Sequence, residues 1–172
     1  MKKTTIILLA VCALAACTPN APSKRYSFSE FQTAYVQNHG HCYDSVASAV
    51  VSLDLYTSDL YLDSTDHIQG TGYNLYLSDI LVPDSLLENG TYRGATSAEA
   101  FTFLPGKSFE GTPTGCYLLT IEQGTLTNIA LIDSGTMVVK DTLDGKRDIQ
   151  LTYYVRRQRY ISHFQGTLTD KQ

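Results

Sequence analysis

The chain has 172 residues, of which 43% are hydrophobic, and its 17 acidic and 13 basic side chains give a net charge of −4. This length and hydrophobic content suit one globular domain with a substantial core. The acidic balance and the scarcity of basic clusters argue against nucleic acid or anionic lipid as the main partner.

The first sixteen residues are typical of a secretory signal. Lys2 and Lys3 precede an apolar run from Thr4 to Leu14. As a helix this run would rise roughly 20 Å, which is too short for a ~30 Å hydrocarbon core. Leu14-Ala15-Ala16-Cys17 resembles the bacterial lipobox, and the resemblance implies cleavage before Cys17 and acylation of its thiol and its new amine. The alternative is an ordinary signal with a chance cysteine beside it.

Removal of residues 1–16 leaves 156 residues and changes the net charge from −4 to −6, because Lys2 and Lys3 are lost. We expect residues 17–26, which contain two prolines and few apolar side chains, to form a lipidated tether. Residues 27–172 are expected to form a single domain that opens with a helical lead-in over 27–41.

A helix is predicted over 28–37. Ser27 to Glu30 fits a capping box, and Phe28, Phe31 and Tyr35 share one helical face. Asn38-His39-Gly40 would end this helix.

From Tyr43 onward the hydrophobic period changes to two, which indicates half-buried strands. In the run over 117–122, Tyr117, Leu119 and Ile121 oppose Leu118, Thr120 and Glu122, and Asp144-Gly145 is a hairpin signal. The predicted strands cover 47–55, 60–62, 73–78, 117–122, 137–139, 149–155 and 160–168. Short alternating runs without long helical patterns predict an all-β domain, namely an antiparallel β-sandwich or a flattened barrel.

Two cysteines remain once the signal and the lipidation site are set aside. Cys42 and Cys116 form an even pair in an oxidising compartment, which makes them candidates for a disulfide. The bridge would close a loop of about 75 residues and contribute on the order of 4 kcal/mol. The alternative is two buried thiols that never meet.

The layout from Val46 to Leu168 resembles small β-sandwich lipoproteins of Bacteroidota. The segments that carry the resemblance are Leu55-Tyr56, Gly90-Thr91-Tyr92, Phe103-Leu104-Pro105-Gly106, Ile132 to Val138 and Phe164-Gln165-Gly166-Thr167-Leu168. Met137 departs from the valine common in that group. The resemblance implies a cell-envelope protein anchored in the outer membrane. Because acidic residues are missing directly after Cys17, it favours the periplasmic face over the cell surface.

The same resemblance implies O-glycosylation within Asp-Ser/Thr-apolar triplets. The candidate acceptors are Ser45, Ser64, Ser85 and Thr142. The alternative is turn chemistry, because Asp followed by Ser or Thr caps turns without any modification.

No catalytic or metal-binding constellation stands out. His39-Gly40-His41-Cys42 has ligand residue types, but the sequence lacks the paired spacing of a structural zinc site, so we expect no metal and no cofactor. Cys42 beside His39 or His41 could form a nucleophile, although no protease signature surrounds it. Ser134 lacks a Gly-x-Ser-x-Gly setting.

Two further features have alternative interpretations. A small basic patch where two strands meet consists of Arg156, Arg157 and Arg159. It is either an anion contact or a charged turn that blocks edge association. The chain has 12 tyrosines and no tryptophan, and Tyr56, Tyr76 and Tyr154 are expected to project outward, where they suit sugar or protein contacts. Tyrosine is also a common strand residue.

These features favour a non-enzymatic binding module of the cell envelope that holds a protein or a glycan, with the lipid bilayer as partner through acylated Cys17 and no nucleic acid. The alternative is a hydrolase of envelope polymers whose site is built from distant strands; paired carboxylates in a pocket, or His163 near an acid, would support it. A fimbria-like subunit that exchanges a terminal strand is a third option.

Overall fold

The computed structural model describes residues 26–27, 30–44 and 46–171, and all of its regular structure is strand. The described residues contain no helix long and apolar enough to cross a membrane. In chain order the strands are β1 (Tyr26–Ser27), β2 (Phe31–Gly40), β3 (Ala49–Thr57), β4 (Leu60–Leu62), β5 (Ile68–Gly70), β6 (Gly72–Val82), β7 (Gly90–Gly94), β8 (Thr102–Phe103), β9 (Lys107–Phe109), β10 (Thr112–Thr114), β11 (Cys116–Glu122), β12 (Thr125–Leu131), β13 (Ser134–Asp141), β14 (Arg147–Val155), β15 (Gln158–Gly166) and β16 (Leu168–Asp170).

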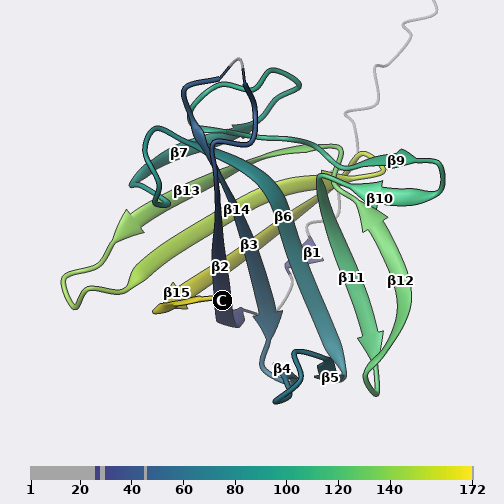
Figure 1. The fold of residues 1–172 in the computed structure, drawn as a ribbon. Helices are drawn as coiled ribbons and strands as arrows, with labels where there is room; N and C mark the ends of the chain where they lie inside the picture. Colours follow the sequence, from purple (N-terminus) through teal and green to yellow (C-terminus); the bar gives the residue numbers. More distant parts are fainter. Residues whose placement is uncertain (1–25, 28–29, 45, 172) are drawn as a thin grey trace, which may run out of the picture.

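Eight strands close into a barrel in the order β2-β3-β6-β8-β7-β13-β14-β15 (Figure 1). The ring is completed by a parallel pairing of β15 with β2 through Phe164 and Phe31. Strand β6 carries a branch, because it also pairs with β11, and β11 pairs in turn with β12 outside the ring. Strand β16 pairs with β2, and β1 pairs with β15.

The structure therefore confirms an all-β fold, and of the two predicted architectures it shows a closed barrel and not a sandwich. Alternation along a strand shows only that one face is buried, which is equally true of a sandwich and of a barrel. The distinction depends on the β2–β15 pairing, which joins residues at opposite ends of the domain.

The helix predicted over 28–37 is replaced by strand from Phe31 onward, because Phe31–Gly40 form β2. Residues 28 and 29 lie outside the described residues. A register shift between Phe31 and Thr33 places one extra residue in β2. Phe31 and Ala34, three positions apart, are consequently both buried, which imitates helical spacing in the sequence.

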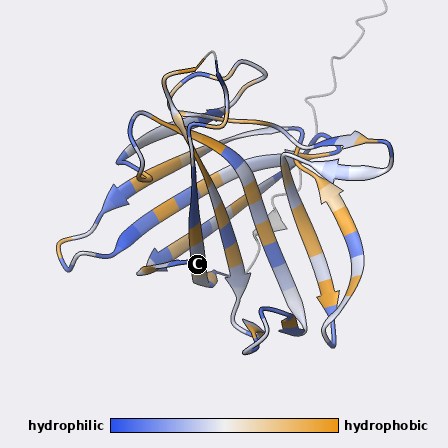
Figure 2. Cartoon of the chain, viewed as in Figure 1, coloured by the Kyte–Doolittle hydropathy of each residue, from blue (hydrophilic) through white to orange (hydrophobic). Residues whose placement is uncertain are grey.

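Side chains fill the barrel interior. Tyr92, Tyr153, Phe31, Phe103 and Phe164 are each at most 2% exposed and pack with leucine, isoleucine and valine side chains from the barrel strands and from β11. Figure 2 shows the alternating hydrophobic and hydrophilic bands along the long strands that produce this core. Filling by side chains is the usual condition of an eight-stranded barrel.

Candidate functional site

Four tyrosines gather on the outer side of the sheet, where β2, β3, β6 and β11 lie side by side (Figure 1). Residues directly opposite each other in neighbouring strands share one face of a sheet. Two adjacent rows of such residues run from β2 to β12. The first row is Tyr35, Asp54, Tyr76, Tyr117 and Leu131, and the second is Thr33, Tyr56, Asn74, Leu119 and Ile129.

We call Tyr35, Tyr56, Tyr76 and Tyr117, together with Asp54 and Asn74, the tyrosine face. It lies on the side of the sheet away from the core, because the alternate residues Leu55, Leu75 and Leu118 belong to the core. Tyr56 is only 2% exposed, whereas Tyr35, Tyr76 and Tyr117 are half-buried. The three outer rings thus form the accessible part of the face.

The rings of the tyrosine face contact one another in pairs. The ring centres of Tyr35 and Tyr56 are 5.6 Å apart in an edge-to-face arrangement, and those of Tyr76 and Tyr117 are 5.0 Å apart at a tilt of 42°. Both separations lie within the favourable range for aromatic pairs. The pairs stand on either side of Asp54 in the first row, so the carboxylate lies between two aromatic groups.

Asp54 is the buried charge of the tyrosine face. Asn74 donates a hydrogen bond to Asp54 Oδ1 at 3.1 Å, and Lys171 Nζ lies 3.5 Å from Asp54 Oδ2. Burial raises the pKa of the Asp54 carboxyl above its ordinary value, although the contacts with Asn74 and Lys171 act in the opposite direction. Burial also raises the pKa of Tyr117 to about 12, so this hydroxyl is a neutral donor at physiological pH.

A polar chain continues the face toward the end of β2. His39 Nε2 lies 2.9 Å from Ser52 Oγ, and Ser52 in turn is hydrogen-bonded to Tyr76. A separate hydrogen bond runs from the Tyr43 hydroxyl to Asp79 Oδ1 at 3.0 Å. The face therefore offers hydroxyl, amide, imidazole and carboxylate groups beside its aromatic rings.

The hairpin formed by β4 and β5 covers the opposite end of the tyrosine face. Leu60 from this hairpin packs with Tyr56 and Ile121 in a second, smaller apolar cluster. The turn of the hairpin is held by Asp63, whose Oδ1 accepts hydrogen bonds from the backbone of Thr65 at 2.9 Å and of His67 at 3.1 Å. The tyrosine face thus has an apolar end and a polar end.

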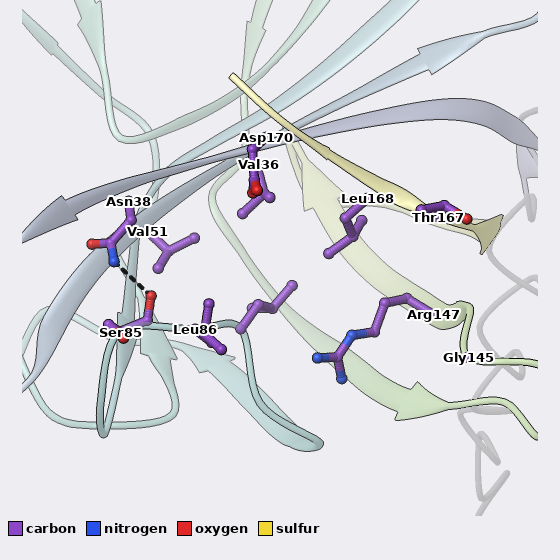
Figure 3. A pocket seen from close by; sticks show the side chains of 11 residues that line it. Val36, Asn38, Val51, Ser85, Leu86, Gly145, Arg147, Thr167, Leu168 and Asp170 are labelled. Atoms are coloured by element: carbon purple, nitrogen blue, oxygen red, sulfur yellow. Dashed lines mark hydrogen bonds between the residues drawn. The ribbon is translucent and has the colours of Figure 1, made fainter. Parts of the chain in front are cut away.

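A hollow, which we call the barrel hollow, lies at one open end of the barrel (Figure 3). It has a volume of about 240 Å³, and its floor includes Val51 and Leu87, which belong to the core. Asn38 Nδ2 donates to the Ser85 carbonyl at 2.7 Å on one side of the hollow, and Arg147 lines the other. The lining thus combines apolar side chains with the polar groups of Asn38, Arg147 and Asp170.

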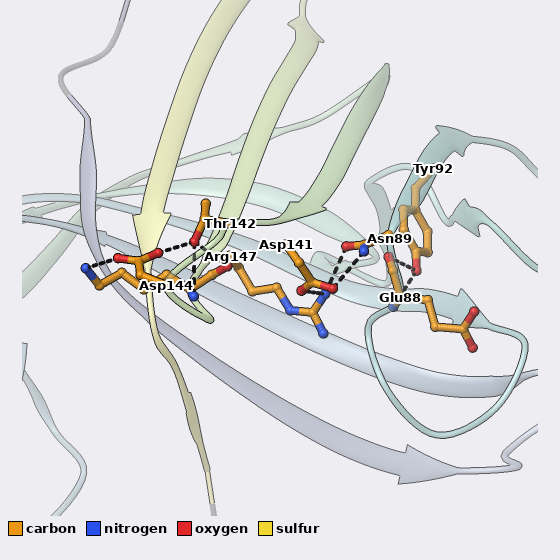
Figure 4. A network of polar contacts seen from close by, with 8 residues as sticks. Glu88, Asn89, Tyr92, Asp141, Thr142, Asp144 and Arg147 are labelled. Atoms are coloured by element: carbon orange, nitrogen blue, oxygen red, sulfur yellow. Dashed lines mark hydrogen bonds and ion pairs between the residues drawn. The ribbon is translucent and has the colours of Figure 1, made fainter.

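The rim beside this hollow is a closed polar network (Figure 4). Arg147 Nη1 lies 2.6 Å from Asp141 Oδ1 and donates to Asn89 Oδ1 at 3.1 Å, while Asn89 Nδ2 donates to Asp141 Oδ2 at 2.7 Å. The Tyr92 hydroxyl donates to the Glu88 carbonyl and accepts from the Glu88 amide, each at 3.0 Å. The carboxylate of Asp141 compensates Arg147, whereas the carboxylates of Glu88 beside the network and of Asp170 in the lining take part in no ion pair within the described residues.

Sequence reasoning identified only part of the tyrosine face. Tyr56, Tyr76 and Tyr154 do lie on outward sides of their strands, but Tyr154 stands apart on β14. Tyr35 lies in the segment predicted as a helix, and the alternation over 117–122 does not show which face of β11 meets the core: Cys116 and Leu118 are buried there, and Tyr117 faces outward. Both faces of β11 are apolar, so alternation alone could not orient it.

The two cysteines are separate free thiols in the structure, in contrast to the predicted bridge. Cys42 is exposed, and its Sγ donates to the His39 carbonyl at 3.0 Å, whereas Cys116 lies in the core. Burial raises the pKa of the Cys116 thiol to about 12. No group of three or more histidine, cysteine or acidic side chains within the described residues is arranged to hold a metal ion.

The candidate modification sites differ in their surroundings. Ser64 and Ser85 are exposed, whereas the Thr142 hydroxyl donates to the Lys146 carbonyl at 2.9 Å and accepts from the Lys146 amide at 3.1 Å. Thr142 therefore has the turn role that was the alternative to glycosylation. Ser45 and Cys17 lie outside the described residues.

Three histidines have partners that matter for catalysis, and one of them is His67 in the exposed β4–β5 turn, whose Nδ1 lies 2.8 Å from Thr65 Oγ1 and 4.0 Å from Asp63 Oδ1. His163 Nε2 lies 2.8 Å from Asp148 Oδ1 on the outer side of β14 and β15, and His39 contacts Ser52 as described above. Within the described part of the chain, no hydrogen bond joins a serine, threonine or cysteine side chain to His163. The structure thus contains a histidine–acid pair and a histidine–serine pair, but it does not join them into one triad.

The tyrosine face and the barrel hollow have to be interpreted from their own chemistry, since fold alone does not assign a function. No protein-family model matches the chain, and neither a curated protein nor a solved structure is significantly similar to it.

Proposed function

We propose that this chain is a lipid-anchored protein of the bacterial cell envelope that binds a glycan on its tyrosine face and does not catalyse a reaction. The signal over residues 1–16 and Cys17 would place it on the outer membrane, with the periplasmic side favoured. The observation that carries the binding role is the arrangement of four tyrosines around Asp54 and Asn74.

A glycan fits this arrangement better than a protein partner does. The apolar faces of sugar rings stack on aromatic rings, and their hydroxyls form hydrogen bonds with carboxylate and amide groups. On the tyrosine face the accessible rings of Tyr35, Tyr76 and Tyr117 supply the stacking surface, and their hydroxyls supply hydrogen-bonding groups, while the buried Asp54–Asn74 pair lies between them. The centre of a protein–protein interface is usually depleted of charge, whereas here a carboxylate lies in the middle.

Calorimetric titration of the purified mature protein with muropeptides and with the polysaccharide of lipopolysaccharide tests the proposal. We expect Tyr76→Ala and Tyr117→Ala each to weaken binding roughly two- to ten-fold, because an aromatic contact adds ~0.5–1.5 kcal/mol beyond its buried area. Tyr154→Ala is the matched control, because this exposed tyrosine lies on β14 outside the tyrosine face. Equal loss in the control, or no binding of either glycan by the unmodified protein, would refute a glycan site there.

A hydrolase of envelope polymers is the second candidate, and the His163–Asp148 contact at 2.8 Å is the observation in its favour. An acid beside an imidazole can orient it as a general base. The mature protein would then release soluble fragments from peptidoglycan, and His163→Ala would abolish the release while His67→Ala, at an exposed histidine of the β4–β5 turn, would not. Absence of turnover by the unmodified protein removes this candidate.

A further inference from the structure

A two-residue turn between β14 and β15 consists of two arginines. Arg156 and Arg157 have φ values of 50° and 67°, and both side chains are exposed. Turns of this conformation favour asparagine and glycine, because positive φ crowds an ordinary side chain. Arginine at both positions is thus not explained by the turn itself.

The charges of this turn are not compensated within the described residues. Neither Arg156, Arg157 nor Arg159 takes part in an ion pair there, and Arg159 Nε is buried without a hydrogen-bond partner. Asp133 is the neighbouring acid, but it accepts a hydrogen bond from the Arg157 backbone amide at 3.3 Å rather than from a guanidinium. We call Arg156, Arg157 and Arg159 the arginine end of the barrel.

The chain enters the barrel at this same end. Strand β1 runs parallel to β15, with Tyr26 beside Tyr160 and Ser27 beside Ile161, so β1 starts near the arginine end and runs away from it. Lys24 and Arg25 directly precede Tyr26 in the sequence. Both lie outside the described residues, so the inference is argued from Arg156, Arg157 and Arg159.

The barrel hollow lies at the other end of the same strands. Gly145 and Arg147 at the start of β14, and Thr167 just after β15, line it. The β13–β14 turn that carries Gly145 stands at the left of Figure 1. The arginine end and the hollow therefore mark opposite ends of β14.

We infer that the arginine end binds anionic lipid headgroups, so that the barrel stands on the membrane with its hollow facing away from it. The inference depends on the proposed lipid anchor only for the orientation of the barrel on the membrane. Cys17 would lie nine residues before Tyr26, which is about 30 Å at full extension. The acidic remainder of the molecule is repelled by an anionic surface, which argues against such a surface as the main partner, so contact with it would be made through this basic end alone. Basic residues near such a surface each strengthen binding by roughly five-fold.

Co-sedimentation of residues 18–172 with lipid vesicles tests the inference without the acyl chains. The described strands in this range form one sheet-linked barrel domain, apart from two small hairpins, so it retains the whole fold. We expect binding to vesicles with 30% phosphatidylglycerol and none to pure phosphatidylcholine, and we expect the binding to disappear in about 0.5 M salt because the charges are exposed.

The informative variant is Arg156→Asn combined with Arg157→Gly. It removes two charges but supplies the residues that the turn conformation favours, so the melting temperature is expected to rise while vesicle binding falls at least ten-fold. Lys140→Gln with Lys146→Gln is the control, because it removes the same charge from exposed positions near the opposite end of β14.

Three outcomes would overturn the inference: equal binding to both vesicle types, equal loss in the lysine control, or unchanged binding in the Asn-Gly variant. The tyrosine face is unchanged in that variant, so its glycan affinity should equal that of the unmodified protein. Loss of vesicle binding with retained glycan binding, or the reverse, therefore separates this inference from the proposed function.

Discussion

At the level of single residues, Asp54 is unusual because a carboxylate is held at 7% exposure between tyrosine rings. Among the residues that the structure describes, its only close cation is Lys171, at 3.5 Å. Removal from water disfavours the charged form more than the surrounding donors favour it, which is why its pKa is raised. Buried charges of this kind lower stability and are often retained for binding.

This raised pKa has a definite consequence for stability. The folded state holds the Asp54 proton more tightly than the unfolded state does, so this group's contribution to the unfolding free energy falls as pH rises above the ordinary value of 3.8. Asp54→Asn removes the effect. Urea unfolding at pH 4 and pH 7 should show the variant gaining stability relative to the unmodified protein at the higher pH. A gain at pH 4 instead would have the wrong sign for a raised pKa.

The two free thiols should also differ in reactivity. Cys42 is exposed, whereas Cys116 is buried with a pKa raised to about 12, so its thiolate is scarce at neutral pH. Maleimide labelling of residues 18–172, followed by mass measurement, should modify one thiol in the native protein and two in denaturant. Native protein that takes up label only after reduction would instead show that Cys42 and Cys116 are bridged.

At the level of elements, the positions of strands in the sequence could be predicted more fully than their partners and their buried faces. The run over 60–62 matches β4, and the run over 149–155 lies within β14, because the turn chemistry around each is local. Strand β12 was missed because most of it is exposed and its alternation is weak. Strand β2 was mistaken for a helix because a register shift gives its buried residues helical spacing.

Which face of β11 is buried could not be predicted from the sequence either. It leaves the barrel beside β6, with Leu118 in the core and Leu119 packed against the second cluster, so both of its faces are apolar. Residues of the tyrosine face are consequently spread over four strands and carry no common motif. Only the register of those strands brings Tyr35, Asp54, Tyr76 and Tyr117 into one row.

The turn before β11 provides a test of how tightly this branch is packed. Gly115 and Gly145 both have a φ of 75°, but a Cβ on Gly115 would lie 2.3 Å from the Pro105 carbonyl oxygen, and a Cβ on Gly145 would meet nothing within 4 Å. Gly145→Ala should cost only the strain of positive φ, about 1–2 kcal/mol. Gly115→Ala should cost more than that, because backbone must also move. Equal losses in urea unfolding would mean that the β11 branch shifts freely.

At the level of the whole molecule, closure of the barrel decides which residues cooperate. The parallel contact of β15 with β2 unites the two ends of the chain, and β16 adds a second pairing to β2. No local sequence pattern indicates such a pairing, since the paired residues are separated by most of the sequence. The core accordingly draws residues from both halves of the domain, including Phe31, Leu75, Met137 and Phe164.

If the barrel is one cooperative unit, a change at the closing contact should destabilise all of it. Phe164 is 1% exposed, and Phe164→Ala should lower the unfolding free energy by about 3–5 kcal/mol. Phe109→Ala is the same substitution at a side chain that is 68% exposed, and it should change stability by no more than about 0.5 kcal/mol.

The chain has 12 tyrosines and no tryptophan, so tyrosine fluorescence and circular dichroism can follow unfolding as independent probes. Both should report one shared transition in each protein, shifted strongly in Phe164→Ala alone. Separate transitions would show instead that the β2-β3-β6 and β13-β14-β15 portions fold independently and that closure adds little.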